Sequence, residues 1–84
     1  MGLAGRYQLP PNYYAPNAVL TLQDRGDYIE ARWEHGEVNV IYPVSADECL
    51  DRMYWARVRF QHAAGKVTGF TYHLVHDFNA RKLD

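Results

Sequence analysis

The sequence contains a single cysteine, and this scarcity removes two ways in which a small protein can stabilise its fold. One cysteine cannot form an intramolecular disulfide, and it cannot supply a cysteine-rich zinc site. The 84 residues are expected to form one domain with a modest core, held by packing and hydrogen bonds alone. We expect residues 5–84 to be that domain, preceded by a short start segment, residues 1–4.

The chain also lacks an excess of positive charge. Nine lysines and arginines stand against ten acidic residues, so the formal net charge is −1. Nucleic-acid-binding proteins draw most of their non-specific affinity from basic side chains, so a nucleic acid is not an expected partner. No apolar run approaches the roughly 18 residues of a membrane span, and the N-terminus has no secretory signal pattern. Membrane insertion is therefore not expected, and the compartment stays open.

Aromatic side chains are abundant, and they favour strands. Turn signals with glycine or proline recur about every 8–12 residues, a spacing typical of small antiparallel barrels and sandwiches. Between the turns, apolar and polar residues alternate: Val58 and Phe60 share a face opposite two arginines. The same rule favours Val38, Val40 and Tyr42 as a buried face. We predict an all-β fold, a small antiparallel up-and-down barrel or meander of roughly seven or eight short strands.

Two further features concern how such a sheet closes. Gly69 comes directly before an alternating run, where a bulge or a close backbone approach would place a glycine. Phe78 and Leu83 lie in a last strand that can pair with the strand near Tyr7. That pairing would remove an exposed sheet edge.

One segment is ambiguous. Ser45-Ala46-Asp47-Glu48 fits a capping box, with apolar residues at helical spacing behind it, and this predicts a short helical turn near 46–53. The alternative is a turn at 45–47 followed by a strand from Cys49 through Tyr54. The sequence leaves both open.

No nucleophile stands in a recognisable catalytic setting. Ser45, the chain's one serine, lies in neither hydrolase signature, and a serine at this place is typical of a turn or cap. Cys49 lies beside Glu48 and near Asp51, which disfavour a thiolate, so a buried and inert cysteine is expected. The run 65–69 lacks the first half of a phosphate-binding loop and predicts a hairpin turn. We therefore expect no catalytic activity in this chain and no cofactor.

A weak metal-site candidate consists of His73, His76 and Asp77. On a strand, the odd spacing sends the two histidines to opposite faces. Only a turn that begins at Val75 would bring His76 round to the others. Surface histidines are therefore the favoured interpretation, and a metal-dependent enzyme is the least favoured of three functional hypotheses.

Exposed aromatic residues are the remaining candidates for a binding or interface site. Tyr13 and Tyr14 lie in a loop rich in proline and asparagine, and Tyr54 and Trp55 adjoin a strand. Aromatic side chains in loops can stack on ligands or anchor an interface, but they can equally belong to the core. For Trp33 and Trp55 the core is the favoured place.

The order of several motifs resembles a known family. The segment 5–10 reads G-R-Y-Q-L-P, similar to a G-x-Y-x-L-P opening, and 40–48 is similar to an L-x-P-x-S-x-D-E segment. The run 57–73 contains G-K-V-T-G, the most specific piece, and 80–83 resembles a closing A-x-R-l. These motifs resemble a small β domain appended to the C-terminus of serine β-lactamase-like and penicillin-binding-protein-like peptidases.

The resemblance implies a lipocalin-like barrel with an accessory role. In that family the catalytic serine and lysine lie in the preceding peptidase domain, so no catalytic residue carries over to this chain. The domain would pack against a catalytic domain in cis or form a homo-oligomer. Cys49-Leu50 stands where the family has phenylalanine, and 13–16 is an insertion-like loop. The alternative is a stand-alone module that binds a cell-wall fragment, a sugar or another small ligand.

Overall fold

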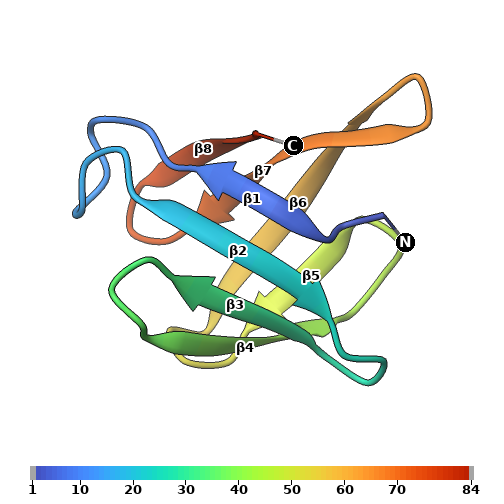
Figure 1. Ribbon diagram of the computed structural model, residues 1–84. Coiled ribbons are helices and arrows are strands. Elements are labelled where there is room, and N and C mark those ends of the chain that lie inside the picture. Colours follow the sequence, from blue (N-terminus) through green and yellow to red (C-terminus); the bar gives the residue numbers. More distant parts are fainter. Residues whose placement is uncertain (1, 84) are drawn as a thin grey trace.

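The computed structural model describes residues 2–83, which form eight antiparallel strands closed into a barrel (Figure 1). The strands are β1 (Gly5–Gln8), β2 (Val19–Asp24), β3 (Ile29–Trp33), β4 (Val38–Pro43), β5 (Glu48–Asp51), β6 (Ala56–Ala63), β7 (Lys66–His73) and β8 (Asp77–Lys82). Each strand pairs with the next one along the chain, so the predicted all-β up-and-down barrel is confirmed. Nothing in the described range is a helix long and apolar enough to cross a bilayer.

The barrel closes where β8 pairs with β1, as the sequence predicted. Tyr7 lies opposite Lys82 in this pairing. Just beyond β8, the Leu83 amide donates a hydrogen bond of 2.7 Å to the Arg6 carbonyl. Phe78 of β8 is buried in the core. Closure leaves neither strand with an unpaired edge along this contact, which removes a site for edge-to-edge aggregation.

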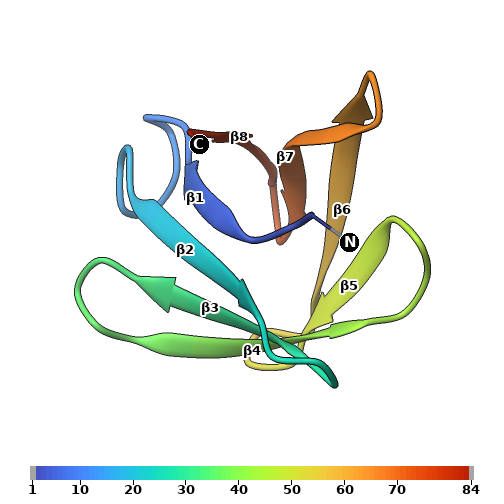
Figure 2. The ribbon, with the colours of Figure 1, turned by 45° about the vertical axis from the view of Figure 1, so that its right-hand side comes forward.

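Side chains fill the interior of the barrel, and in Figure 2 all eight strands wrap around that one core. Val58 and Phe60 are buried, as predicted from their alternation. The rings of Tyr7, Phe60 and Phe70 pack against one another, with centroids 5.2–6.3 Å apart. The cavity left among the core side chains measures only about 10 Å³, so the interior has no room for a ligand.

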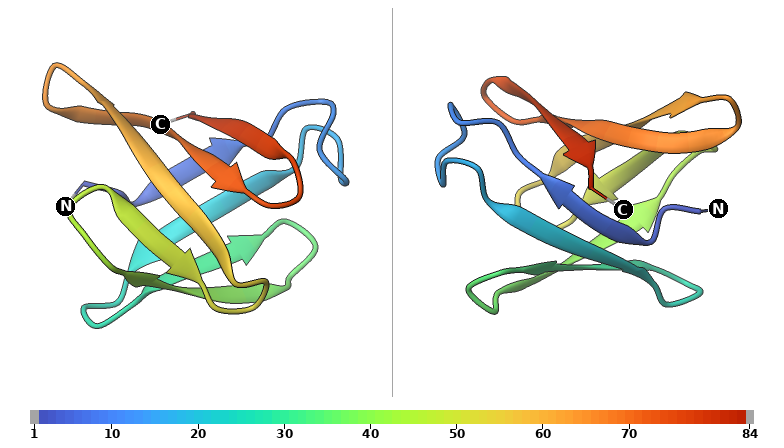
Figure 3. Two further views of the ribbon diagram at one scale, coloured as in Figure 1. Left: turned by 180° about the vertical axis from the view of Figure 1, so that it is seen from behind. Right: turned by 45° about the horizontal axis from the view of Figure 1, so that its top comes forward.

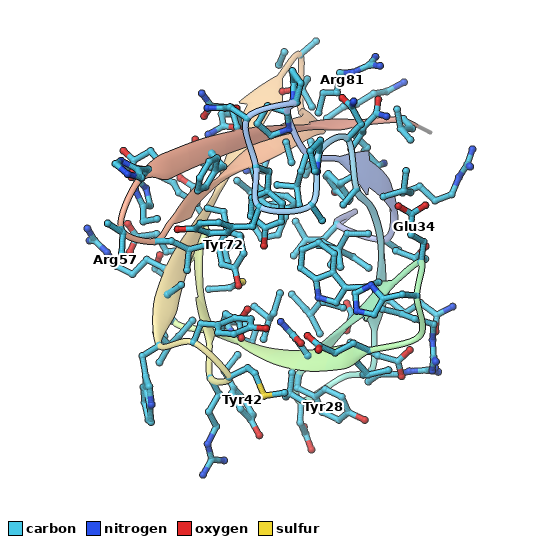
Figure 4. All side chains as sticks on the ribbon, turned by 90° about the vertical axis from the view of Figure 1, so that its left-hand side faces the viewer. Tyr28, Glu34, Tyr42, Arg57, Tyr72 and Arg81 are labelled. Atoms are coloured by element: carbon cyan, nitrogen blue, oxygen red, sulfur yellow. The ribbon has the colours of Figure 1, made fainter. Side chains whose placement is uncertain are left out.

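The predicted buried face of β4 is wrong. Asn39 and Ile41 point into the core, whereas Val38, Val40 and Tyr42 lie on the outer surface. Tyr42 points away from the barrel in Figure 4. The alternation was correct in period but inverted in phase, because the pattern assigned the face with more apolar residues to the core. The inward polar position is tolerated because the Asn39 amide is hydrogen bonded to a buried carboxylate.

The predicted helical turn near 46–53 is also wrong. The Ser45 hydroxyl does accept a hydrogen bond of 3.2 Å from the Glu48 amide, as in a capping box, but the chain then enters β5. The alternative, a turn followed by a strand, is confirmed in outline. The strand ends at Asp51 instead of continuing to Tyr54, because the Met53 amide bonds back to the Asp51 carboxylate and starts a turn.

Successive strands run in opposite directions, so the connecting segments lie alternately at the two ends of the barrel. The β1–β2, β3–β4, β5–β6 and β7–β8 connections lie together at one end, on the left in Figure 1. We call this end the mouth. The other three connections lie at the opposite end, together with the start of β1 and the finish of β8 (Figure 3).

Candidate functional site

The aromatic and metal-site candidates from the sequence gather at the mouth, although they are far apart along the chain. The β1–β2 connection contributes Tyr13 and Tyr14, and the β5–β6 turn contributes Tyr54 and Trp55. The β7–β8 turn and its flanks contribute the remaining three, His73, His76 and Asp77. This convergence follows from the closed up-and-down topology, in which alternate connections share one end of the barrel.

A cavity of about 520 Å³ opens at the mouth, and four connections of the barrel contribute to its wall. Its size falls within the range of ordinary ligand sites, roughly 300–1,000 Å³. The residues that line it are Tyr13, Tyr14, Ala15, Trp33, His35, Glu37, Tyr54 and Leu74. Three of the four predicted aromatic candidates thus share one cavity, and we call this cavity the aromatic mouth.

Tyr13 forms the floor of the aromatic mouth. Its ring stacks on Trp33, with centroids 5.8 Å apart and planes 7° apart, and meets the edge of Phe78 at 5.0 Å. It also stacks on Tyr72 of the core at 6.4 Å. The β1–β2 connection therefore folds back over the barrel, and Tyr13 separates the filled interior from the open cavity.

The two tryptophans have opposite environments, so the preferred core placement is confirmed for one and wrong for the other. Trp33 is 6% exposed, whereas Trp55 is 72% exposed and does not line the cavity. The next residue, Ala56, takes the inward position at the start of β6, which directs Trp55 outward. Trp33 and Trp55 nonetheless lie at the same end of the barrel.

Glu37 is the carboxylate on the wall of the aromatic mouth. Its Oε2 accepts a hydrogen bond of 3.2 Å from the Tyr54 hydroxyl, which joins the β3–β4 and β5–β6 connections. The His35 Nε2 lies 4.0 Å from Glu37 Oε1, and the His35 ring stacks on Trp33 at 6.5 Å. Trp33, His35 and Glu37 were not selected as site residues from the sequence.

A buried polar cluster lies beneath the mouth, and the sequence did not predict it. The Asp51 carboxylate is 1% exposed and accepts hydrogen bonds from the Tyr72 hydroxyl and from Asn39 Nδ2, the latter at 3.1 Å. The Met53 amide donates to its other oxygen at 2.9 Å. Figure 4 shows Tyr72 directed into the barrel. The available signal was the alternation of β5, which places Asp51 on the same inward face as Cys49.

Burial holds several tyrosines in the neutral form. It raises the pKa of Tyr7 to about 12. It also raises the pKa of Tyr13 to about 12, with smaller contributions from neighbouring groups that include Asp51 and Glu37. The pKa of Tyr72 is raised by burial first and then by its hydrogen bond to Asp51.

These pKa shifts predict how the protein responds to alkali. Unfolded tyrosine titrates near pH 10, so the folded state holds these protons more tightly than the unfolded state. The contribution of Tyr7 and Tyr13 to stability is complete below about pH 10 and is lost as the pH rises through about 12. In a tyrosinate absorbance titration, Tyr7, Tyr13 and Tyr72 should form a late group whose ionisation accompanies unfolding. The control is the protein in guanidinium, where all seven tyrosines should titrate together; one early phase in the folded protein would contradict the prediction.

The histidine candidates do not assemble with enough partners for a metal centre. His73 Nδ1 lies 2.9 Å from Asp77 Oδ1, while His76 meets the edge of Phe78 with centroids 6.5 Å apart. Within residues 2–83, no three histidine, cysteine, aspartate or glutamate side chains converge on one point. The pair His73–Asp77 bridges the two ends of a hairpin turn.

The two potential nucleophiles occupy structural positions. The Ser45 hydroxyl accepts a hydrogen bond from the Glu48 amide, in a turn at the end of the barrel opposite the mouth. Cys49 is buried, as expected, and burial raises the pKa of its thiol to about 11. Neither side chain lines the aromatic mouth.

Comparison of the chain with models of known families, with curated proteins and with solved structures finds no match. The resemblance to a peptidase-appended domain therefore remains a prediction based on sequence motifs. The aromatic mouth has the size, the apolar lining and the few polar groups that are typical of small-molecule sites.

Proposed function

We propose that this barrel is a non-catalytic binding module whose aromatic mouth holds a small ligand or a protruding side chain of a partner. The observation that carries the proposal is the cavity of about 520 Å³, built from four separate connections and lined by three tyrosines and Trp33. Aromatic rings offer large contact areas with few rotatable bonds, so they bind at a low entropic cost. The barrel interior is filled, so the ligand would be held at the mouth and not inside the barrel.

The chemical settings of Ser45 and Cys49 support a role without catalysis. A nucleophile needs an adjacent base or a depressed pKa. The Ser45 hydroxyl is engaged by a backbone amide, and the pKa of the Cys49 thiol is raised instead. Recognition is therefore the better explanation of the aromatic mouth.

A second candidate function is that of an accessory domain of a serine hydrolase. It is supported by the motif resemblance and by a groove of about 370 Å³ on the outside of the barrel, lined by Val38, Val40, Tyr42, Arg52 and Met53. A catalytic domain in cis, or a second copy of the chain, would cover these exposed apolar side chains. A reading frame that encodes no hydrolase, together with a monomeric sedimentation profile, would overturn this candidate.

Fluorescence of Trp33 provides the test of binding. In a Trp55→Phe variant, Trp33 is the remaining tryptophan and lies in the wall of the aromatic mouth. Titration with cell-wall fragments, sugars and small organic amines should give a saturable change in emission with at least one class, at a Kd below about 1 mM. No response to any class up to about 10 mM would overturn the proposal.

A matched pair of variants then locates the site. Tyr14 and Tyr42 are both exposed tyrosines, but Tyr14 lines the mouth and Tyr42 lies on the outer face. Tyr14→Ser should weaken binding about five- to tenfold, the effect of losing one aromatic contact. Tyr42→Ser should leave the affinity unchanged. Equal effects of the two substitutions would place the ligand elsewhere.

A further inference from the structure

The aromatic mouth combines ring faces with negative charge. Its tyrosine and tryptophan rings come from the β1–β2 connection, the end of β3 and the β5–β6 turn, and Glu37 is its one acidic residue within the described range 2–83. Neither lysine nor arginine appears among the described residues that line it. Arg52 belongs to the β5–β6 turn but lines the outer groove with Val38. The part of this wall that residues 2–83 form therefore carries no permanent positive charge, although the whole chain contains nine lysines and arginines.

The electron distribution of the rings favours one class of ligand. The face of an aromatic ring carries partial negative charge, so a cation placed over it is attracted. Tyr14 is 67% exposed and Tyr54 is also exposed, so both leave ring surface open to a ligand. The rings of Tyr13 and Tyr14 meet at 59°, with centroids 5.3 Å apart, so they face the cavity from different directions.

Two carboxylates reinforce the attraction for a cation. Glu37 is held at the wall by the Tyr54 hydroxyl, and Asp51 lies buried below. Both contribute, after burial, to the raised pKa of Tyr13, so their field reaches the floor of the cavity. The wall thus combines aromatic rings with a carboxylate, and both groups attract a cation more strongly than a neutral ligand.

We propose that the aromatic mouth binds an organic cation, namely an alkylated ammonium group. This inference rests on the proposed binding function and adds the chemical class of the ligand. The group can belong to a free small molecule such as choline or to a methylated lysine on a partner peptide. Alkylation suits the site, because an alkylated ammonium is weakly hydrated and its methyl groups contact ring faces.

The experiment compares a cation with its neutral isostere in the Trp55→Phe protein. Choline and 3,3-dimethylbutan-1-ol have nearly the same shape and differ in charge. Choline should bind at least about tenfold more tightly, judged by Trp33 emission. A trimethyl-lysine peptide, compared with the same peptide carrying unmodified lysine, separates the two sources of the ammonium group. Preference for choline or for the methylated peptide supports the inference in either case.

Glu37 tests the contribution of charge. Glu37→Gln should weaken choline binding about fivefold and leave the neutral alcohol unaffected. The control is Glu34→Gln, since Glu34 is an exposed glutamate of the same connection that does not line the cavity (Figure 4). Equal binding of choline and its isostere would overturn the cation inference while leaving the binding function intact. Absence of binding by every ligand would overturn both.

Discussion

Replacing Asp51 with alanine is expected to lower the free energy of unfolding by about 4 kcal/mol. The substitution removes the acceptor of three hydrogen bonds, from the Tyr72 hydroxyl, from Asn39 and from the Met53 amide. The Tyr72 hydroxyl and the Asn39 amide, left unpaired in the barrel interior, each cost roughly 1–3 kcal/mol, and the lost carboxylate leaves a void beside them. Urea denaturation followed by tryptophan fluorescence measures the change.

The matched control is Asp27→Ala, in which an exposed aspartate is removed from the β2–β3 turn. Its effect should stay within about 0.5 kcal/mol, as for most surface substitutions. Asp51→Asn should give an intermediate loss, because it keeps the shape and one acceptor oxygen but adds a donor. A loss below about 1 kcal/mol in Asp51→Ala would show that the buried carboxylate is dispensable.

The Asp51 cluster also connects stability to the aromatic mouth. The Met53 amide bonded to Asp51 fixes the β5–β6 turn, and that turn presents Tyr54 to Glu37. The Tyr72 ring, held by the same carboxylate, supports Tyr13 from below. A polar group at the centre of a small barrel is costly unless its hydrogen bonds are satisfied, and here the same bonds position the β5–β6 turn and the Tyr72 ring.

Alternation predicted most of the barrel because the core of a small closed sheet needs one apolar face from each strand. It worked on β6 and β7, where the inward set is apolar. It failed on β4, where Asn39 faces inward and three apolar side chains face outward. The partner that makes this arrangement stable, Asp51, belongs to another strand, so the window around β4 contained no sign of it.

The candidate site could be predicted only in part, for a related reason. Tyr13, Tyr14 and Tyr54 were identified by their loop positions, and all three line the aromatic mouth. Trp33 and Glu37 were missed because their role depends on which connections share an end of the barrel. Local sequence gives the type of each side chain, whereas closure of the sheet determines which side chains meet.

Replacing Gly69 with alanine is expected to cost about 3 kcal/mol, near the upper end for overpacking a core. A Cβ at this position would lie 2.2 Å from the Ala80 carbonyl oxygen and 3.2 Å from the Arg81 Cα, which are backbone atoms of β8. No side-chain rotation can relieve such a contact, so β8 would have to move away from β7. Gly69 lies opposite Gln61 of β6, whereas the next residue of β6, His62, lies opposite Val67. The pairing of β6 with β7 is therefore irregular next to Gly69, where the sequence predicted a bulge or a close backbone approach.

Thr68→Ala is the control for this effect. Thr68 precedes Gly69 on the same strand, is exposed, and makes one long side-chain contact, 3.4 Å from its Oγ1 to the Gln61 carbonyl. Its substitution should change the free energy of unfolding by less than about 0.5 kcal/mol. Amide exchange in β8 should accelerate in Gly69→Ala and stay slow in Thr68→Ala. The amides of β8 are protected by its pairing with β7 and β1, and a β8 that is pushed away from β7 loses part of that protection. If both variants had the free energy of unfolding and the β8 amide exchange of the parent protein, the prediction would be wrong. The close approach of β7 and β8 would then not be needed for the stability of the barrel.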